Sequence, residues 1–529
     1  MKKVLFVLAL TSCAALLGCD RGELTCDAPK LACGETCVNA QTDPANCGGC
    51  GLACASGQSC SAGVCTCASG ATRCGEACVD TGSDTENCGG CEERCEANEL
   101  CEEGACVEDC AAGRTLCGTG CVDLDSDRAN CGACGTACAQ GQSCAGGACS
   151  ATVFAACFNT GELVALDDDL QPAAASTLVG SGPQALARGA NRVLVADAVD
   201  NALYGFDPAS SPLAKAAGAD RLGKAASQLL VRDGHAFVVN TGDNTVQVVD
   251  LTKPAPAEID ASRTIDEIAT KVGSPASEAN TAPAFAAFAG EKLYVSLTGT
   301  CYPDPEAGHQ AGNRLLEVDV STTPGALGRE LVFAATDYER DEGVTESSPR
   351  PAGVAARGTT IYVAIGNLNP GCMGSAGPGY LAVVDTAAVT LTARNLKLPD
   401  ACRNPAYVLA SETRLYVSCL GSYGAGARPE EALVVLDAAT EQVVATTVFP
   451  RCEGFEDGPN ACRTAVPGRL ALHGNRLLVA DNNAGRILVT DLDGAIPAGF
   501  EQGVQICGPK CYGENTDCYQ FTSDVLSIR

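Results

Sequence analysis

From residue 150 onward, seven segments alternate apolar and polar residues, and each one ends in an aspartate. They are GELVALD, NALYGFD, NTVQVVD, NRLLEVD, GYLAVVD, EALVVLD and GRILVTD, which end at Asp167, Asp207, Asp250, Asp319, Asp385, Asp437 and Asp491. The alternation predicts β-strands. An aspartate that follows a strand favours a tight turn, because its carboxylate can hydrogen-bond to the backbone just beyond it. A ring of seven metal-binding aspartates is the alternative, but sevenfold repetition favours the turn role.

Two further predicted strands precede most of these segments. The nearer one reads RVLVAD, HAFVVN, KLYVSL, TIYVAI, RLYVSC or RLLVAD, and the one before it usually opens with a proline, at Pro183, Pro283, Pro351, Pro405 and Pro467. Proline at the first residue of a strand removes no hydrogen bond from the ladder. A weaker fourth strand, such as EQVVATTVF, follows each aspartate turn. Four antiparallel strands repeated at this spacing predict a β-propeller.

The pattern over residues 152–529 resembles the YVTN-type propellers of bacterial surface proteins and of lactonase-like enzymes. The first blade lacks its proline strand, and SDVLSI at 523–528 can supply it. The C-terminus would then pair beside Val153–Cys157, which leaves no open sheet edge at that point. The expected fold is all-β: a seven-bladed β-propeller whose last strand is 523–528.

The lengths of the connections distinguish the two faces of this propeller. The turns between the first and second strands of each blade are short, and we call that side the turn face. The connections after the second strand, and those between blades, emerge on the opposite side, the loop face. Several are long, at 298–312, 366–378, 450–466 and 503–522. Long loops on a rigid scaffold are where binding residues gather, so the loop face is the predicted ligand or partner surface.

A different repeat precedes the propeller. Residues 26–65, 67–106 and 110–149 each hold eight cysteines in the spacing C-x6-C-x3-C-x9-C-x2-C-x3-C-x5-C-x4-C. About 40 residues rich in Gly, Asp, Glu, Asn and Ser cannot form a sufficient apolar core, so cross-links must replace it. Zinc or an iron–sulfur cluster is the alternative, but Cys26–Cys149 contains no histidine and every copy has an even cysteine count. We therefore predict three modules, each closed by its own four disulfides.

The core D-x2-NCGxCGxxC, complete at 43–54 and 127–138, resembles the stigma-specific cysteine-rich family of plants. The second copy departs from it at Glu92, where the others have Gly51 and Gly135. The resemblance implies an extracellular, disulfide-bonded module with no defined enzymatic activity.

The N-terminus predicts export. Lys2 and Lys3 precede an apolar run from Val4 to Leu17, which is short for a membrane span. The following Leu-Leu-Gly-Cys resembles the lipobox of bacterial lipoproteins, which implies a signal peptide over 1–18, lipidation of Cys19 and a tether over 19–25. Anchoring at the outer membrane or cell surface is the expectation, with a periplasmic location as the alternative. An ordinary secretory signal is the other interpretation.

Composition excludes some functions. The chain has a formal net charge of −29, which disfavours nucleic acid and anionic membrane surfaces as partners. It has no tryptophan for stacking a quinone cofactor, no glycine-rich phosphate loop, and only three histidines. His235 and His473 fall at tight turns, and only His309 lies in a long loop. No catalytic set, cofactor or metal ligand is predicted.

The leading functional hypothesis is a tethered, non-enzymatic binding or adhesion protein that presents the loop face to a protein, glycan or small molecule. The alternative is a lactonase-like hydrolase or lyase working in the propeller channel. Metal storage by the thiols is a weaker third hypothesis.

The blade alignment also predicts pairs among the ten propeller cysteines. Cys157 and Cys419 end second strands, next to where the first strand of the same blade begins. That position predicts the pairs Cys402–Cys419 and Cys157–Cys518. Cys452 and Cys462 share one loop, and Cys301 and Cys372 occupy matching loops of neighbouring blades, so each of these is an expected pair. Cys507–Cys511 is left by elimination.

Overall fold

The structure is a computed structural model that describes most of residues 26–528. The longer gaps are 271–280, 300–311, 370–373, 422–430, 450–465 and 513–516, and one to three residues are left out at several other points. The chain divides into two compact units, Met1–Gly135 and Thr136–Arg529. Residues 1–25, which include the lipidation candidate Cys19, lie outside the described residues. Across the described part, no helix is both long and apolar enough to cross a membrane.

Short β-hairpins make up the cysteine-rich repeats. Their strands are β1 (Leu31–Cys33), β2 (Thr36–Val38), β3 (Gln58–Ser61), β4 (Val64–Cys67), β5 (Thr72–Cys74), β6 (Ala77–Val79), β7 (Leu100–Glu102), β8 (Ala105–Val107), β9 (Thr115–Cys117), β10 (Gly120–Val122), β11 (Ser143–Ala145) and β12 (Ala148–Ser150). Few large apolar side chains are buried in them. The buried residues of the first unit are mostly cysteines, such as Cys47, Cys88 and Cys101.

Disulfides follow one connectivity in every repeat. In the first repeat the pairs are Cys26–Cys37, Cys33–Cys50, Cys47–Cys60 and Cys54–Cys65. The second repeats all four at the same separations, and the third shows three of them, while its remaining two cysteines are also disulfide-bonded. Each of these bridges stays inside its own repeat, as the even counts predicted.

Sulfur atoms nevertheless cluster as they would around a metal. Those of Cys47, Cys54 and Cys65 lie within 4.8 Å of one another, and the other two repeats contain equivalent groups. The cluster arises because the Cys47–Cys60 and Cys54–Cys65 disulfides lie side by side. A sulfur held in a disulfide is not a thiolate and is no ligand for zinc.

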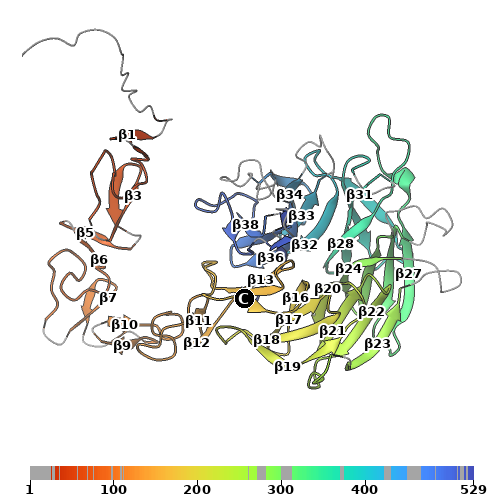
Figure 1. Cartoon of the computed structure of the whole chain (residues 1–529), viewed down its shortest axis with the longest axis horizontal. Coiled ribbons are helices and arrows are strands. Elements are labelled where there is room, and N and C mark those ends of the chain that lie inside the picture. The colour runs from red at the N-terminus through yellow and green to blue at the C-terminus, as the bar shows by residue number, and fades with distance from the viewer. Residues whose placement is uncertain are drawn as a thin grey trace, which may run out of the picture. The chain divides into compact units, whose positions relative to one another are not determined.

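Seven antiparallel four-stranded sheets form the propeller (Figure 1). The inner strands are β16 (Pro183–Gly189), β20 (Ala226–Arg232), β24 (Pro283–Ala289), β28 (Pro351–Arg357), β32 (Pro405–Ala410), β36 (Pro467–His473) and β42 (Thr522–Ser527). The second strands are β17 (Arg192–Asp197), β21 (His235–Asn240), β25 (Lys292–Leu297), β29 (Thr360–Ile365), β33 (Arg414–Leu420), β37 (Arg476–Asp481) and β13 (Val153–Cys157).

The outer half of each sheet holds the aspartate-ended strand and the weaker fourth strand. The third strands are β18 (Ala202–Asp207), β22 (Thr245–Asp250), β26 (Arg314–Asp319), β30 (Tyr380–Asp385), β34 (Glu431–Asp437), β38 (Arg486–Asp491) and β14 (Glu162–Leu166). The fourth strands are β19 (Ala214–Arg221), β23 (Thr264–Ala269), β27 (Ala326–Val332), β31 (Ala393–Lys397), β35 (Val443–Thr447), β39 (Val504–Gln505) and β15 (Thr177–Leu178). A separate hairpin joins β40 (Lys510–Tyr512) to β41 (Asp517–Tyr519), and a single 3-10 turn, η1, spans Ala335–Asp337.

The repeated aspartates form turns. In every blade Oδ1 of the aspartate accepts a hydrogen bond from the backbone N–H two residues further on, for example Asp207 from Ala209 at 2.9 Å and Asp437 from Ala439 at 3.1 Å. The other five make the same bond. The predicted turn role is confirmed.

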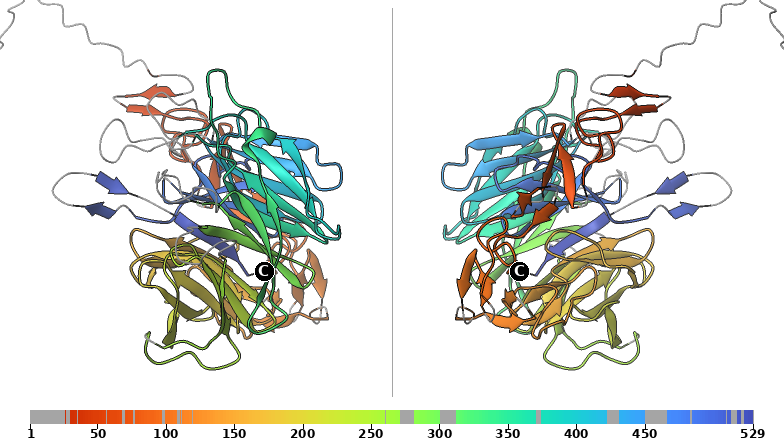
Figure 2. Two further views of the ribbon diagram at one scale, coloured as in Figure 1. Left: turned by 90° about the vertical axis from the view of Figure 1, so that its right-hand side faces the viewer. Right: turned by 90° about the vertical axis from the view of Figure 1, so that its left-hand side faces the viewer.

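The C-terminal strand completes the first blade, as predicted. β42 pairs antiparallel with β13, and the Ser523 hydroxyl donates to the Pro183 carbonyl at 2.6 Å. Each inner strand contacts the inner strand of the next sheet from β16 to β36, and β42 contacts both β36 and β16. The inner strands therefore surround a common centre (Figure 1). Figure 2 shows the sheets of the propeller from two sides.

The apolar core lies between neighbouring sheets. One cluster joins Phe154 and Leu163 of the first blade to Val195 and Phe206 of the second, and equivalent clusters follow around the ring. The last cluster packs β37 and β38 against β13 and β42. Each sheet is thus stabilised by its neighbours on both sides.

The last hairpin of the third repeat packs on the first blades. The Gln142 amide donates to the Ala209 carbonyl at 2.9 Å, and the Asp168 N–H donates to the Ser143 hydroxyl at 2.9 Å. A Cβ added to Gly141 would lie 2.4 Å from the Ala173 nitrogen, so only glycine permits this approach.

Two propeller disulfides lie within the described residues. Cys402 and Cys419 form the predicted pair, with a Cα–Cα distance of 5.2 Å. The predicted Cys157–Cys518 and Cys507–Cys511 pairs are wrong, because Cys157 bonds to Cys507 at a Cα–Cα distance of 5.4 Å. The Cys507 sulfur atom lies 3.4 Å from the Thr522 hydroxyl oxygen at the start of β42, which is the place predicted for Cys518 from the sequence. The chain passes that place first and only then forms the β40–β41 hairpin. Cys301, Cys372, Cys452 and Cys462 lie outside the described residues.

Peptide mapping of the unreduced chain should recover Cys157 linked to Cys507. The backbone register places Cys511 opposite Cys518, so these two are the expected remaining pair at the C-terminus. A peptide that links Cys157 to Cys518 would contradict the revised assignment.

A buried ion pair ties the seventh blade together. Arg486 Nε donates to Asp481 Oδ2 at 2.8 Å, with side-chain exposures of 2% and 0%. Asp481→Asn should lower the free energy of unfolding by about 3–5 kcal/mol, because a buried arginine loses its counter-charge. Asp493→Asn is the control, since Asp493 is 63% exposed in its pair with Arg414 and should cost at most about 1 kcal/mol. Equal losses of unfolding free energy in Asp481→Asn and Asp493→Asn, measured by chemical denaturation, would refute this prediction.

Candidate functional site

Seven equivalent residues, one on each inner strand, form a ring around the middle of the propeller channel, and all of them except Ala185 line its cavity. Each is the third residue of an inner strand, and together they are Ala185, Gln228, Phe285, Gly353, Tyr407, Arg469 and Asp524. In all seven strands the register with the neighbouring strand shifts within the first four residues. Such β-bulges redirect side chains, and their repetition places seven equivalent positions around one axis.

The side chains of the ring differ in size. A Cβ added to Gly353 would lie 2.6 Å from the Ala406 carbonyl oxygen and 2.7 Å from Tyr407 Cα. The absence of a side chain at Gly353 therefore allows β32 to approach, and Tyr407 occupies that side of the ring.

Arg469 is the central cation. It is only 9% exposed, and its Nη2 donates to the Ser227 carbonyl oxygen. The guanidinium carbon lies 5.2 Å from the Phe285 ring centre and 5.8 Å from that of Tyr407, and these two rings meet edge to face at 5.3 Å. The aromatic pair thus holds the guanidinium group.

Arg469 has donors that the protein does not satisfy. Its Nε is buried without a hydrogen-bond partner, and its Nη1 lies 3.7 Å from Asp524 Oδ2, beyond hydrogen-bond distance. A buried N–H without an acceptor is costly, so these donors favour an acceptor brought by a ligand.

Asp524 is the central anion, on the C-terminal strand. Its carboxylate accepts the backbone N–H groups of Leu186 and Val525, both at 2.8 Å. Burial raises the pKa of Asp524 to about 6, although Arg469 and the two N–H groups act in the opposite direction. The Asp524 carboxyl group is therefore partly protonated in mildly acidic solution.

This pKa predicts an unusual dependence of stability on pH. The folded pKa is about 6 and the reference value is 3.8, so between them the folded chain binds more protons than the unfolded one. Below pH 3.8 the proton on Asp524 contributes roughly 3 kcal/mol to the free energy of unfolding. This contribution is lost as the pH rises through about 6. Relative to Asp524→Asn, the wild type should lose stability from pH 4 to pH 7. Parallel unfolding curves over that range would contradict this.

The ring borders a cavity of about 520 Å³. The lining runs from the third residue of the inner strands to the sixth, so the cavity extends from the middle of the channel towards the turn face. Beyond the ring the lining is mostly small or aliphatic, including Leu230, Val354, Leu409, Ala471 and Leu526. This size and this mixture of apolar wall and few polar groups are typical of small-molecule sites.

A serine, a histidine and an aspartate meet at the turn-face end of the cavity. His473 Nδ1 lies 3.0 Å from the Ser527 hydroxyl, and its Nε2 lies 3.6 Å from Asp168 Oδ1. Ser527 lines the cavity. Burial, followed by the nearby Arg476, lowers the pKa of His473, which favours the neutral ring. The prediction that His473 sits at a tight turn holds, but its contact with Ser527 could not be read from the sequence.

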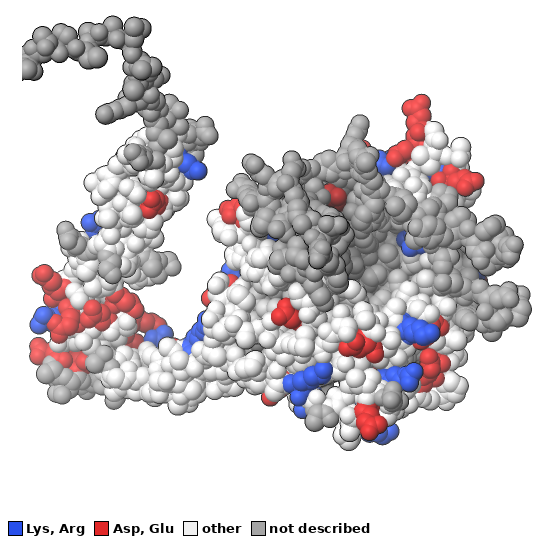
Figure 3. Space-filling model, in the orientation of Figure 1, with Lys and Arg blue, Asp and Glu red and all other residues white. Residues whose placement is uncertain are grey.

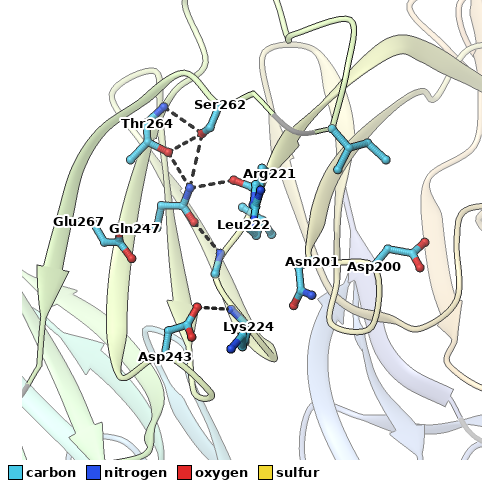
Figure 4. Close-up of a pocket in the computed structure, with 12 residues that line it drawn as sticks. Asp200, Asn201, Arg221, Leu222, Lys224, Asp243, Gln247, Ser262, Thr264 and Glu267 are labelled. Carbon is cyan, nitrogen blue, oxygen red and sulfur yellow. Dashed lines mark hydrogen bonds between the residues drawn. The ribbon is translucent and has the colours of Figure 1, made fainter. Parts of the chain in front are cut away.

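A second cavity of about 510 Å³ lies between the second and third blades (Figure 4). Several of its polar groups already serve the fold: Gln247 bridges the Gly223 N–H, the Arg221 carbonyl and Thr264, and Asp243 accepts the Lys224 N–H at 2.6 Å. Among the described residues, no buried polar side-chain atom of this lining lacks a hydrogen-bond partner, in contrast to Arg469 Nε in the channel.

Charge is distributed unevenly over the surface (Figure 3). In the first unit, exposed acidic residues gather on the second repeat, at Glu86, Glu92, Glu93, Glu96 and Glu103. On the propeller face drawn, acidic and basic residues alternate. The long connections of the predicted loop face fall largely outside the described residues, so the channel is the best-defined candidate site.

Comparisons with known proteins cover the two parts of the chain separately. The stigma-specific STIG1-like protein family matches residues 103–152. No curated protein sequence matches the chain.

Among solved structures, a putative 6-phosphogluconolactonase from Bacteroides uniformis is 12% identical, covers 72% of this chain and 99% of its own, and has a TM-score of 0.47. Apo AztD from Citrobacter koseri is 13% identical, with 72% and 98% covered and a TM-score of 0.43. A functionally unknown protein from Desulfotomaculum acetoxidans is 12% identical, with 67% and 98% covered and a TM-score of 0.43. These similarities give no information about ligand or activity.

Proposed function

We propose that the chain is an exported, membrane-tethered, non-enzymatic binding protein with its ligand site in the propeller channel. The observation that carries the proposal is Arg469, a buried cation with an unpartnered Nε at a cavity of ligand size. The disulfide-rich repeats support an exported location. The Leu-Leu-Gly-Cys sequence that ends at Cys19 supports the lipid tether.

A thermal-shift screen combined with product analysis tests the binding claim. The full chain is incubated with a panel of small acids, amides, lactones and sugars, and each mixture is analysed for both melting temperature and products. We expect some compounds to stabilise the chain, by about 2.7 kcal/mol at a hundredfold excess over Kd, and to be recovered unchanged. A panel with no stabilising compound would overturn the proposal.

A hydrolase is the second candidate, favoured by the Ser527–His473–Asp168 cluster. One ring nitrogen faces a hydroxyl and the other a carboxylate, which is the arrangement that activates a serine nucleophile. The 3.6 Å separation from Asp168 is longer than a hydrogen bond, which favours a structural contact. Lactone or ester turnover that Ser527→Ala abolishes, at an unchanged melting temperature, would establish the hydrolase instead.

The tether is tested by labelling with a radioactive fatty acid in a bacterial host. We expect label in the wild type and in Cys13→Ala, and none in Cys19→Ala. Label that persists in Cys19→Ala would refute lipidation at that residue.

A further inference from the structure

We propose that the channel binds a small amphipathic monocarboxylate, with its carboxylate on Arg469 and its hydrocarbon part along the apolar wall. This inference rests on the proposed binding function and names the class of ligand.

The donors of Arg469 determine the polar end of the ligand. Nε has no partner, Nη1 is beyond hydrogen-bond distance of Asp524, and Nη2 is engaged by the Ser227 carbonyl. A guanidinium N–H group without an acceptor matches a carboxylate oxygen, because a charge-assisted hydrogen bond is stronger than a neutral one. The contacts with Phe285 and Tyr407 fix the plane of the guanidinium group before the ligand arrives, which reduces the entropy lost on binding.

The charge of the site favours one negative charge on the ligand. Among the described residues that line the cavity, Arg469 is the only cation, and Asp524 lies beside it. A doubly charged phosphate would meet one arginine and one carboxylate, with repulsion from the latter. A cationic ligand would need Asp524, whose two oxygens already accept backbone N–H groups of Leu186 and Val525.

The wall determines the rest of the ligand. From the ring towards the turn face the lining includes Leu230, Val354, Leu409 and Leu526. Leu230, Leu409 and Leu526 are only partly buried, so a hydrocarbon chain laid along them would remove apolar surface from water.

Protonation of Asp524 should strengthen binding. At neutral pH the Asp524 carboxylate competes for Arg469, whereas below its pKa of about 6 the arginine is the unopposed charge. Arg469 on β36 is the one charged group that shifts this pKa, and β16 presents the Leu186 N–H to it. Affinity for a carboxylate should therefore rise as pH falls from 7.5 to 5.5.

Calorimetric titration of the full chain with octanoate, octanamide and inorganic phosphate tests the inference. We expect one octanoate per chain, with octanamide and phosphate each at least about tenfold weaker. Octanamide loses the charge-assisted pair with Arg469, whereas phosphate has no hydrocarbon part to bury and is repelled by Asp524. Arg469→Gln should abolish the preference for octanoate over octanamide. The matched control, Arg414→Gln, removes a partly exposed arginine of the sixth blade that pairs with Asp493 of the seventh, and it should leave both affinities unchanged.

The outcomes separate the ligand class from the binding function. Equal affinities for octanoate and octanamide, tighter binding of phosphate, or an octanoate Kd weaker than about 1 mM would each overturn the carboxylate class. The binding function would still stand if the thermal-shift screen identified other ligands. If Arg469→Gln fails to fold, the inference is tested by the octanoate affinity of Arg469→Lys and by the pH dependence of octanoate binding to the wild type. Unchanged octanoate affinity in Arg469→Lys together with a flat pH profile would refute the inference.

Discussion

Deletion of residues 523–529 should abolish the cooperative unfolding transition of the propeller. The truncation removes almost all of β42, the inner strand of the first blade, and leaves the inner edge of β13 unpaired. It also removes Val525 from the cluster that packs the seventh blade against the first. The cost should be comparable with the whole stability of a typical domain, about 5–15 kcal/mol.

Scanning calorimetry of the full chain and the truncated chain measures this effect. Deletion of Arg529 alone is the control and should leave the melting temperature unchanged. Addition of a synthetic 520–529 peptide should restore part of the transition. A truncated chain that melts at the wild-type temperature would show that β42 does not close the first blade.

Reduction of the disulfides should unfold all three cysteine-rich repeats. Each repeat buries little except cystine, as Cys47, Cys60 and Cys88 illustrate. Bridges that span 11 to 17 residues contribute about 3 kcal/mol each, so four of them exceed what the small apolar core can replace. Amide NMR spectra of the repeats should lose their dispersion after reduction.

Treatment with a chelator distinguishes disulfide-bonded repeats from metal-bound ones. EDTA should leave these spectra unchanged, and thiol titration of the unreduced chain should detect no abundant free thiols. Among variants, Cys47→Ser with Cys60→Ser should be more disruptive than Cys26→Ser with Cys37→Ser, because the former pair is buried. Loss of dispersion with EDTA alone would support a metal centre instead.

Local repetition explains what could be predicted from the sequence. The aspartates make their own turns with neighbouring backbone N–H groups, so seven occurrences reveal seven blades. Prolines open five of the seven inner strands and mark their first position, and the ring residues follow two positions later. Cys402 and Cys419 pair because both lie close to one such strand start.

Long-range placement explains what could not be predicted. Cys157 bonds to Cys507 because the chain returns past the start of β42 before it forms the β40–β41 hairpin, and no local pattern signals that order. The pairing of Arg469 with Asp524 joins strands from two blades. Either residue alone reads as an ordinary charged residue in a strand. Only closure of the ring brings them to one cavity.

Saturation-transfer NMR with octanoate tests the central claim, a ligand site in the channel, most directly. It compares the full chain with Ala471→Trp, which fills part of the cavity, and with Val389→Trp, which adds the same side chain at a position 93% exposed. We predict transfer to octanoate in the wild type and in Val389→Trp, and none in Ala471→Trp at an unchanged melting temperature. Equal transfer in all three proteins would contradict a ligand site in the channel.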